Sequence, residues 1–311
     1  MSKKNVVFMG TPDFAVPILE LLIEKTNVVM VVTKPDKPVG RKRIITPSPV
    51  KRAASLHNIE VFQPEKIRND FTPLEKIDID LIVTCAYGQI IPQVILDMPK
   101  YGAVNVHASI LPKYRGAAPI QWALLNGDKK TGVTIMYMDA GMDTGDIIKI
   151  KETDILESDN VGTLHEKLSL LGRDALDECL DDIFCGKAKR VKQGDNYTLA
   201  PMIKRENERL DFTKTGEEII NKIRAFNPFP LANIIIDNEE VKVLDATFER
   251  HENTKVGLIV GDKKTLGVMC QDGIIYFQKI KPSGKKELDI KSYLNGKSNS
   301  NIIGKYINDE K

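Results

Sequence analysis

The first half of the chain alternates short apolar runs with segments of helical periodicity. Helical patterns open at Thr11-Pro12-Asp13, although Pro17 favours a later start, and at Ser48-Pro49, continuing to about Asn58. Strands separated by helices predict βαβ units, and therefore a Rossmann-like α/β domain with a mostly parallel sheet. The short, largely apolar runs typical of buried strands are Val6–Met9, Val28–Val32, Leu81–Cys85 and Ala103–His107.

The pattern changes after the fourth predicted strand. Two further strands, Val133–Met138 and Ile147–Lys151, are separated by only eight residues. This is too short for a helical crossover, so we expect an antiparallel pair. A long helix is predicted over residues 160–184, with Gly186 where a C-cap glycine belongs.

The last hundred residues are rich in short strands. Residues 187–209 are polar and weakly patterned, which indicates a linker, and one helix is predicted at Glu217–Ala225. Short strands with turn residues between them predict a small sandwich or barrel, and of these we expect an OB-like β-barrel. The expected domains are therefore 1–186 and 210–311. The predicted strands of the second domain are Ala232–Ile236, Val241–Ala246, Val256–Val260, Thr265–Cys270 and Gly273–Ile280.

Composition narrows the class of protein. The 311 residues are 42% hydrophobic and 28% charged, which is ordinary for a globular protein and argues against wholesale disorder. No apolar run approaches the roughly 20 residues of a membrane span, and the N-terminus lacks a signal-peptide pattern, so we expect a cytoplasmic protein without a membrane role. The four cysteines are dispersed, which argues against a zinc site or a disulfide framework.

Positive charge is concentrated in particular places. The net charge is only +2, but basic residues outnumber acids after residue 186, whereas acids are in slight excess before it. Residues 34–52 hold seven basic side chains and a single acid, Asp36. This distribution suits a polyanion that is contacted at defined positions. A solvated charged loop would look the same in the sequence.

Two polar segments follow predicted strands and carry candidate chemistry. Asn105 and His107 point to the same face of a strand, at the carboxyl edge where open α/β sheets bind ligands. The loop Met138–Asp146 supplies acids, and its spacing does not match an EF-hand. An Asn that stabilises an oxyanion, a His that moves a proton and an Asp that orients the His suit acyl transfer without a covalent intermediate. The alternatives without a catalytic role are that His107 is a structural residue and that Met138–Asp146 is a surface loop.

The segment Asn105-Val106-His107-Ala108-Ser109-Ile110-Leu111-Pro112, followed by Tyr114-Arg115-Gly116 and later by Asp143-Thr144-Gly145, resembles the 10-formyltetrahydrofolate-dependent formyltransferases. The resemblance implies that Asn105, His107 and Asp143 are catalytic, that 10-formyltetrahydrofolate is the co-substrate, and that no metal is needed. It further implies that Ala86–Pro92 is the pterin-pocket loop. The residues expected to contact folate are Tyr87, Gln89, Ile90, Ile91, Ser109, Ile110, Leu111, Pro112 and Asp139.

Further motifs are similar to the members of that family that act on initiator methionyl-tRNA. They include Gly10–Ala15, Lys34–Pro38, Pro47–Lys51 and Arg224–Pro230, where Phe229 replaces an expected Trp. The resemblance implies formylation of the α-amino group of methionyl-tRNA by a chain expected to be a monomer, with 210–311 as a tRNA-binding domain. The residues expected to contact tRNA are Arg41, Lys42, Arg43, Lys204 and Arg205.

Rival functions remain open from the sequence. One is a formyltransferase acting on another amine, such as a nucleotide sugar or glycinamide ribonucleotide, and another is a non-catalytic RNA-binding relative. The basic loop and the second domain argue against the first, and the complete Asn, His and Asp set argues against the second. A dinucleotide enzyme is disfavoured because Gly10–Ala15 lacks the second and third glycines of the nucleotide fingerprint.

Overall fold

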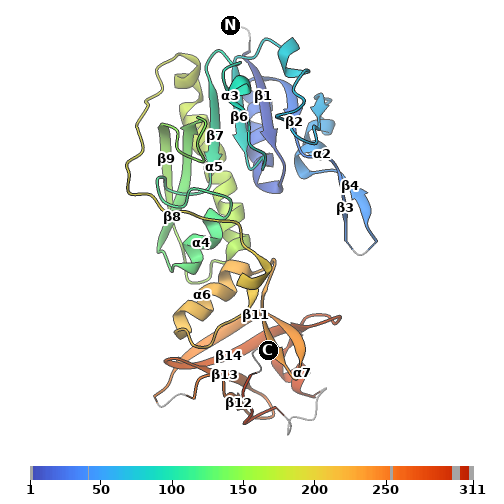
Figure 1. The fold of residues 1–311 in the computed structure, drawn as a ribbon, viewed down its shortest axis with the longest axis vertical. Coiled ribbons are helices and arrows are strands. Elements are labelled where there is room, and N and C mark those ends of the chain that lie inside the picture. The colour runs from blue at the N-terminus through green and yellow to red at the C-terminus, as the bar shows by residue number, and fades with distance from the viewer. Residues whose placement is uncertain (1–2, 41, 253–254, 296–301, 308–311) are drawn as a thin grey trace. The chain divides into compact units, whose positions relative to one another are not determined.

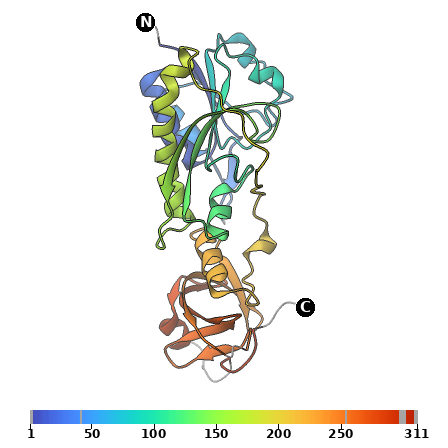
Figure 2. The same ribbon diagram turned by 90° about the vertical axis from the view of Figure 1, so that its left-hand side faces the viewer.

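A computed structural model describes residues 3–40, 42–252, 255–295 and 302–307. The chain divides into two compact units, each assembled from three segments (Figures 1 and 2). Unit 1 comprises Met1–Pro119, Lys130–Asp154 and His165–Pro201. Unit 2 comprises Ile120–Lys129, Ile155–Leu164 and Met202–Lys311. The predicted division into 1–186, 187–209 and 210–311 stays a prediction.

Unit 1 is built on a seven-stranded sheet of order β5-β2-β1-β6-β7-β8-β9 (Figure 1). The first five strands in this order are parallel, whereas β8 runs antiparallel to both of its neighbours. The predicted α/β class and the antiparallel pair are therefore confirmed. The strands are β1 (Asn5–Gly10), β2 (Asn27–Val32), β5 (Val61–Phe62), β6 (Leu81–Cys85), β7 (Ala103–His107), β8 (Lys130–Tyr137) and β9 (Ile147–Asp154).

Helices and 3-10 turns connect these strands. The long predicted helix is confirmed as α5, and Gly186 after it takes the left-handed conformation (φ 67°) expected of a C-cap glycine. The helical elements of this part of the chain are η1 (Asp13–Ala15), α1 (Val16–Lys25), α2 (Pro49–Leu56), η2 (Leu74–Lys76), α3 (Gln93–Leu96), α4 (Pro119–Leu125) and α5 (Val161–Phe184).

The helix start at Thr11 is wrong, and the later start indicated by Pro17 is confirmed. The Thr11 hydroxyl donates to the carbonyl of Tyr87 (3.2 Å) instead of capping a helix, and α1 begins at Val16 after the short turn η1. Pro17 then lies in the first turn of α1, where its missing N–H costs no hydrogen bond. The second start is correct, because the Ser48 hydroxyl accepts from the N–H of Lys51 (3.1 Å).

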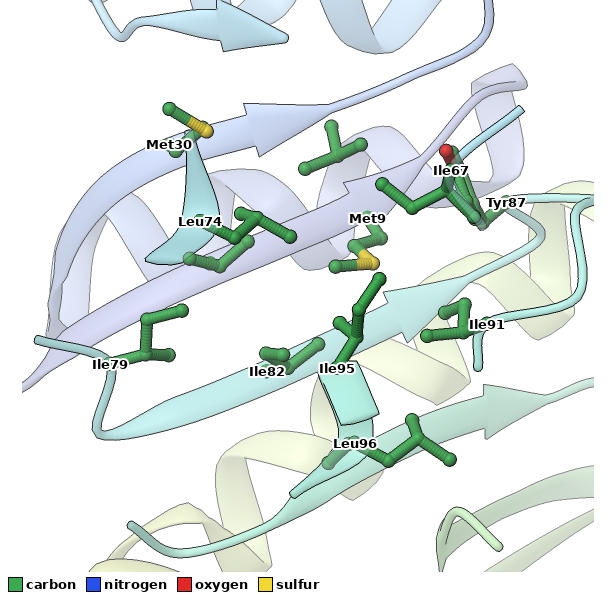
Figure 3. Close-up of a cluster of buried hydrophobic side chains, with 13 residues drawn as sticks. Met9, Met30, Ile67, Leu74, Ile79, Ile82, Tyr87, Ile91, Ile95 and Leu96 are labelled. Carbon is green, nitrogen blue, oxygen red and sulfur yellow. The ribbon is translucent and has the colours of Figure 1, made fainter. Parts of the chain in front are cut away.

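Apolar side chains fill both faces of the sheet. On one face, Met9, Met30 and Ile82 pack against Leu74 of η2 and Ile95 of α3 (Figure 3). On the other face, residues of α5 approach so closely that a Cβ on Gly172 would lie 2.8 Å from the side chain of Val106. Because neighbouring residues of β7 face opposite sides, Asn105 and His107 are on the face away from α5.

The charged segment 34–52 contains a β-hairpin where the sequence indicated a loop. Strands β3 (Lys37–Val39) and β4 (Ile44–Thr46) pair in a separate two-stranded sheet that projects from the edge of unit 1 (Figure 1). The strands are too short for a periodic signal. Their exposed apolar side chains, Val39, Ile44 and Ile45, also give no core pattern.

Unit 2 is centred on an antiparallel sheet of order β10-β11-β14-β13-β12, with β15 beside β14. The predicted β-rich second domain and the helix at Glu217–Ala225 are confirmed. Within the described ranges, no pairing joins β10 to β12. The elements are η3 (Arg205–Glu208), α6 (Gly216–Phe226), β10 (Ala232–Ile236), β11 (Glu239–Arg250), β12 (Ile259–Gly261), β13 (Leu266–Cys270), β14 (Gly273–Pro282), β15 (Leu288–Asp289) and α7 (Ile290–Asn295).

One predicted strand needs correction, and the segment predicted as a linker contains local structure. The strand expected at Val256–Val260 begins only at Ile259, because Val256 and Gly257 (φ 83°) form a turn. The segment predicted as a linker contains η3. All four cysteines are free, and of the helices described none is both long and apolar enough to span a membrane.

Candidate active site

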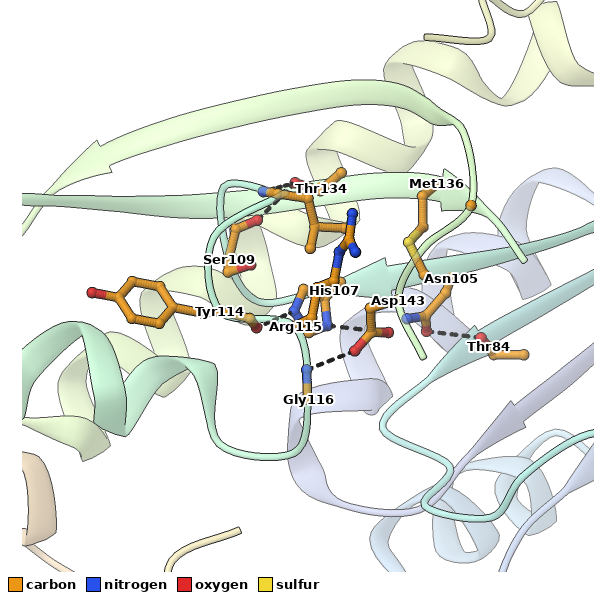
Figure 4. Close-up of polar contacts among 12 residues, drawn as sticks. Thr84, Asn105, His107, Ser109, Tyr114, Arg115, Gly116, Thr134, Met136 and Asp143 are labelled. Atoms are coloured by element: carbon orange, nitrogen blue, oxygen red, sulfur yellow. Dashed lines mark hydrogen bonds and ion pairs between the residues drawn. The ribbon is translucent and has the colours of Figure 1, made fainter. Parts of the chain in front are cut away.

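Three side chains singled out in the sequence meet at the carboxyl edge of the unit 1 sheet. Asn105 and His107 come from β7, and Asp143 comes from the loop between β8 and β9 (Figure 4). The carboxylate Oδ1 of Asp143 lies 3.7 Å from Nδ1 of His107. Asn105 and His107 share one face of β7, and the loop that carries Asp143 folds back to the same edge of the sheet. The three predicted residues therefore lie together.

The imidazole of His107 is buried, and each of its two nitrogens faces an oxygen atom. Its Nε2 lies 3.0 Å from the carbonyl oxygen of Tyr114. A carbonyl only accepts hydrogen bonds, so Nε2 carries the hydrogen and Nδ1 is the nitrogen available for proton transfer. Tyr114 adopts a left-handed conformation (φ 62°), which turns its backbone at this point. Nothing in the sequence pattern indicated a role for the Tyr114 carbonyl, because its position depends on the conformation of the loop after β7.

The carboxylate of Asp143 is fixed by a backbone donor. The N–H of Gly116 donates to Oδ2 of Asp143 (2.8 Å), which leaves Oδ1 toward His107. Gly116 has φ 128°, and a Cβ there would lie 2.6 Å from the carbonyl oxygen of Ala200. Gly145 is equally constrained, since its Cβ would lie 1.8 Å from the carbonyl oxygen of Tyr137. Both glycines of the quoted motifs are thus required by close backbone approaches.

The amide of Asn105 is oriented by a neighbouring strand. The hydroxyl of Thr84, on β6, donates to Oδ1 of Asn105 (2.8 Å). The amide NH₂ of Asn105 has no protein partner among the described residues, and it is the donor that an oxyanion would need. Thr84 was missed in the sequence because its hydroxyl lies inside an apolar strand.

A second missed residue is Gln193, which lies in the segment predicted as a linker. Its Nε2 donates to the backbone carbonyls of Asp143 and Gly145, at 2.8 Å each. Its Oε1 accepts from Nε (3.0 Å) and from the terminal NH₂ (2.7 Å) of Arg115. Sequence reasoning had no signal for this contact, which joins residues about fifty and eighty positions apart.

The expected folate residues of the first loop have different environments. Ile91 is buried in the apolar cluster with Tyr87, whereas Ile90 is 84% exposed. The Tyr87 hydroxyl is buried without a hydrogen-bond partner in the described part of the chain, and burial raises the pKa of this phenol to about 12. Gln89 accepts from the N–H of Ile67 (2.8 Å) and donates to the carbonyl of Pro64 (3.2 Å), so it shapes the adjacent loop.

The expected folate residues after β7 are held by their own loop. The buried Ser109 hydroxyl donates to the carbonyl of Lys113 (2.6 Å), and Thr134 accepts from the N–H of Leu111 (3.1 Å). Ile110 and Pro112 are partly buried, in contrast to the buried Leu111. Asp139 accepts from the N–H of Gly141 (2.9 Å) and the hydroxyl of Thr144 (2.6 Å), which organises the acidic loop. Folate contact by these residues stays a prediction.

The basic residues expected at tRNA lie in two separate places. Lys42 and Arg43 are exposed on the β3–β4 hairpin, whereas Arg41 lies outside the described residues. Lys204 is exposed and lies 3.7 Å from Glu206. Arg205 is paired with Glu208 (2.6 Å) and with Glu240, so its charge is already matched by carboxylates. Contact of these residues with tRNA stays a prediction.

The root of the hairpin is fastened by a polar cluster. Lys51 Nζ donates to Asp36 Oδ2 (2.6 Å) and to Gln63 Oε1 (2.7 Å), and Gln63 Nε2 donates to the carbonyl of Lys34 (2.9 Å). The hydrogen bond from Lys51, followed by that from Gln63, lowers the pKa of the Asp36 carboxyl. The motifs around Lys34 and Lys51 are thus joined by one set of hydrogen bonds, which we call the Lys51–Asp36–Gln63 anchor.

Comparison with known proteins places this site in a family. A formyl transferase model matches residues 3–180, and a formyl transferase C-terminal domain model matches residues 202–298. The chain belongs to the formyl transferase family. Methionyl-tRNA formyltransferase of Listeria innocua is 47% identical over 297 residues, with 94% of this chain and 95% of that protein covered. The enzyme of that name from Staphylococcus aureus is 44% identical over 307 residues, covering 97% and 98%.

A solved formyl transferase structure has the same fold. The N-formyltransferase of Helicobacter canadensis, solved with folinic acid and dTDP-3-aminofucose, gives a TM-score of 0.66 at 21% identity, with 93% of this chain and all of that chain covered. The formyl transferase fold therefore spans both units. In the described residues of this family member, no group of three or more His, Cys, Asp or Glu side chains is placed to hold a metal ion.

Proposed function

We propose that this chain transfers the formyl group of 10-formyltetrahydrofolate to the α-amino group of initiator methionyl-tRNA. The observation that carries the chemistry is the assembly of Asn105, His107 and Asp143 at the carboxyl edge of β7. The acceptor is supported by the methionyl-tRNA formyltransferases that are 44–47% identical over nearly the full chain. The reaction belongs to translation initiation and to the cytoplasm.

In the proposed step, the amine nitrogen attacks the formyl carbon directly. A carbon–nitrogen bond forms, and the bond from the formyl carbon to N10 of the folate breaks. The free NH₂ of Asn105 donates to the carbonyl oxygen as it becomes negative. One proton leaves the amine and one reaches N10, so charge balances, and His107 Nδ1 with Asp143 forms the local relay.

Substrate binding is divided between two surfaces. The folate is proposed to bind along the loops that follow β6 and β7, where exposed Ile90 adjoins the buried Tyr87 and Ile91. The tRNA is proposed to contact the β3–β4 hairpin through Arg41, Lys42 and Arg43, and unit 2 through Lys204 and Arg205. Phosphate contacts of this kind set position and affinity without reading bases.

The acceptor is tested by a competition between amines. The full chain is incubated with 10-formyltetrahydrofolate and either charged initiator tRNA, an amino sugar nucleotide or glycinamide ribonucleotide. We expect rapid formylation of the charged tRNA alone. Preference for either small amine would overturn the acceptor, and tRNA binding without formyl transfer would indicate an RNA-binding relative. Sedimentation of the same sample checks the expected monomer.

A further inference from the structure

Both groups that contact the His107 ring are held by one stretch of chain, residues 193–200. The Tyr114 carbonyl contacts Nε2, and the N–H of Tyr114 donates to the hydroxyl of Thr198 (2.9 Å). The carboxylate of Asp143 faces Nδ1, and the carbonyl of Asp143 accepts from Gln193. The stretch lies in unit 1 and was predicted from sequence to be a linker.

The orientation of the Gln193 amide is fixed by the chemistry of its partners. Arg115 can only donate hydrogen bonds, and the carbonyls of Asp143 and Gly145 can only accept them. The oxygen of the amide therefore faces the guanidinium, and its nitrogen faces the two carbonyls, at the distances given above. No other side chain of similar size offers both an acceptor and two donors, and a glutamate would place an oxygen against two carbonyl oxygens.

The two carbonyls held by Gln193 flank a backbone that needs support. Asp143 is in the left-handed conformation (φ 54°), which costs a non-glycine residue about 1 kcal/mol or more. Its carboxylate must also meet the N–H of Gly116, whose neighbour Arg115 is the other partner of Gln193. The side chain of Gln193 thus connects the loop that carries Asp143 to the loop that carries Gly116, and the carboxylate of Asp143 lies between these loops.

The stretch itself is fastened to the loop that carries Arg115. The N–H of Arg115 donates to the carbonyl of Thr198 (2.9 Å), and the N–H of Ala200 donates to the carbonyl of Arg115 (2.7 Å). The guanidinium carbon of Arg115 lies 4.6 Å from the centre of the Tyr197 ring. These contacts fix the backbone near Gln193 relative to Arg115.

We propose that Gln193 is a positioning residue that holds Asp143 in line with His107 through its bridge to Arg115. The inference rests on the proposed function, because the readout of that alignment is formyl transfer. It assigns a role in turnover, and none in binding folate or tRNA, to a residue outside the segments that carry the trio.

The first test compares full-length variants. Gln193→Ala and Gln193→Glu should lower kcat about 10- to 100-fold, since a small displacement of a catalytic group has effects of this size. The KM values for both substrates should stay within about twofold. The matched controls are Asn196→Ala and Asn196→Asp. Asn196 lies in the same stretch, is exposed and has no side-chain partner in the described chain, so these changes should leave kcat unaltered.

A double-mutant cycle separates positioning from general damage. If Gln193 acts through Asp143, Gln193→Ala should have almost no further effect on kcat in an Asp143→Ala background. An equal loss in both backgrounds, a matching loss in the Asn196 variants, or unchanged kcat in both Gln193 variants would each overturn the proposal.

A readout without turnover keeps the inference separate from the proposed function. The chain has four histidines, so the imidazole NMR signals of His107 can be resolved from those of His57, His165 and His251. Gln193→Ala should move the His107 signals alone. If the wild-type chain formylates no amine but the His107 signals move, the function is wrong and the positioning stands. If they do not move, the positioning is wrong whatever the activity.

Discussion

The Nε2 atom of His107 lies 3.0 Å from the carbonyl oxygen of Tyr114, and this contact assigns the ring hydrogen to Nε2, while Nδ1 faces Asp143. Because the carbonyl fixes the hydrogen on Nε2, the imidazole presents Nδ1 to the carboxylate 3.7 Å away. In the proposed reaction a proton can therefore be taken up or released only at Nδ1, and Asn105 beside it is left to act on the carbonyl oxygen of the formyl group.

Removing the amide of Asn105 tests the oxyanion role. Asn105→Ala should lower kcat by about 10²–10³ while folate binding changes little, because the donor acts on charge that develops only in the transition state. His107→Asn should be at least as damaging. Near-normal kcat in either variant, with folate binding measured by titration as the control, would contradict the assigned role.

The hydroxyl that orients Asn105 can be removed without changing the size of the side chain. Thr84→Val deletes the donor to Oδ1 and frees the amide to rotate, so kcat should fall about tenfold, which is less than the loss expected for Asn105→Ala. Steady-state kinetics with charged tRNA measure the difference. The order of the two losses is the critical result, and a larger loss from Thr84→Val would exclude an orienting role.

A methyl group on Gly116 tests the backbone donor to Asp143. The Cβ would press on the Ala200 carbonyl and oppose φ 128°, so Gly116→Ala should destabilise the fold by about 1–3 kcal/mol and lower kcat as well. Gly186→Ala is the matched control. Gly186 also has positive φ but open space around its Cβ, so this change should cost about 1 kcal/mol in denaturant unfolding without altering kcat.

Charge removal on the hairpin tests the proposed tRNA surface. Lys42→Ala and Arg43→Ala should each weaken tRNA binding and flatten its salt dependence by about one unit in the log–log slope, without affecting folate binding. Arg205→Ala should flatten the slope less, because Glu208 and Glu240 already neutralise Arg205. Filter binding across a salt series measures the slopes, and equal effects from all three changes would contradict this ranking.

The carboxylate of Glu178 on α5 should make the unfolding stability of the protein depend on pH. Lys149, then Lys151, lower the pKa of Glu178 to about 2, from an ordinary value of 4.5. A carboxyl group whose pKa is lower in the folded state stabilises the fold at any pH above its unfolded-state pKa. This stabilisation is lost as the pH falls through the folded-state pKa. Wild type should therefore be more stable than Glu178→Gln at pH 7, and the gap in urea unfolding should close between about pH 4.5 and 2. High salt should narrow the gap at pH 7; a gap that widens in acid would refute the pairing.

The sequence was informative where one residue's neighbours along the chain determine its environment. The strands β6 and β7 are recognisable because burial on both faces demands apolar runs, and the facing of Asn105 and His107 follows from the two-residue period of a strand. The Tyr114 carbonyl, Thr84 and Gln193 could not be found in this way, because their contacts depend on how distant loops return to the sheet.

The contacts of residues 193–200, within the predicted linker 187–209, show the same limit. Polar composition indicated a connecting segment, but residues 193–200 lie against the loop after β7 and contact Arg115. The unit boundaries also interleave along the chain. Arg224 of α6 donates to the carbonyls of Asp159 (2.7 Å) and Leu156 (2.6 Å), so a truncation near residue 209 would remove contacts from an earlier part of unit 2.

The β3–β4 hairpin is structurally separate from the sheet that carries the candidate active site. A two-stranded sheet is only marginally stable alone, and this one joins the rest of the chain through the Lys51–Asp36–Gln63 anchor. Its exposed strand residues Val39, Ile44 and Ile45 can therefore be exchanged without repacking the sheet that carries Asn105 and His107. The hairpin is therefore a separable element of the chain, and its exposed side chains can be substituted while the geometry of Asn105 and His107 is kept.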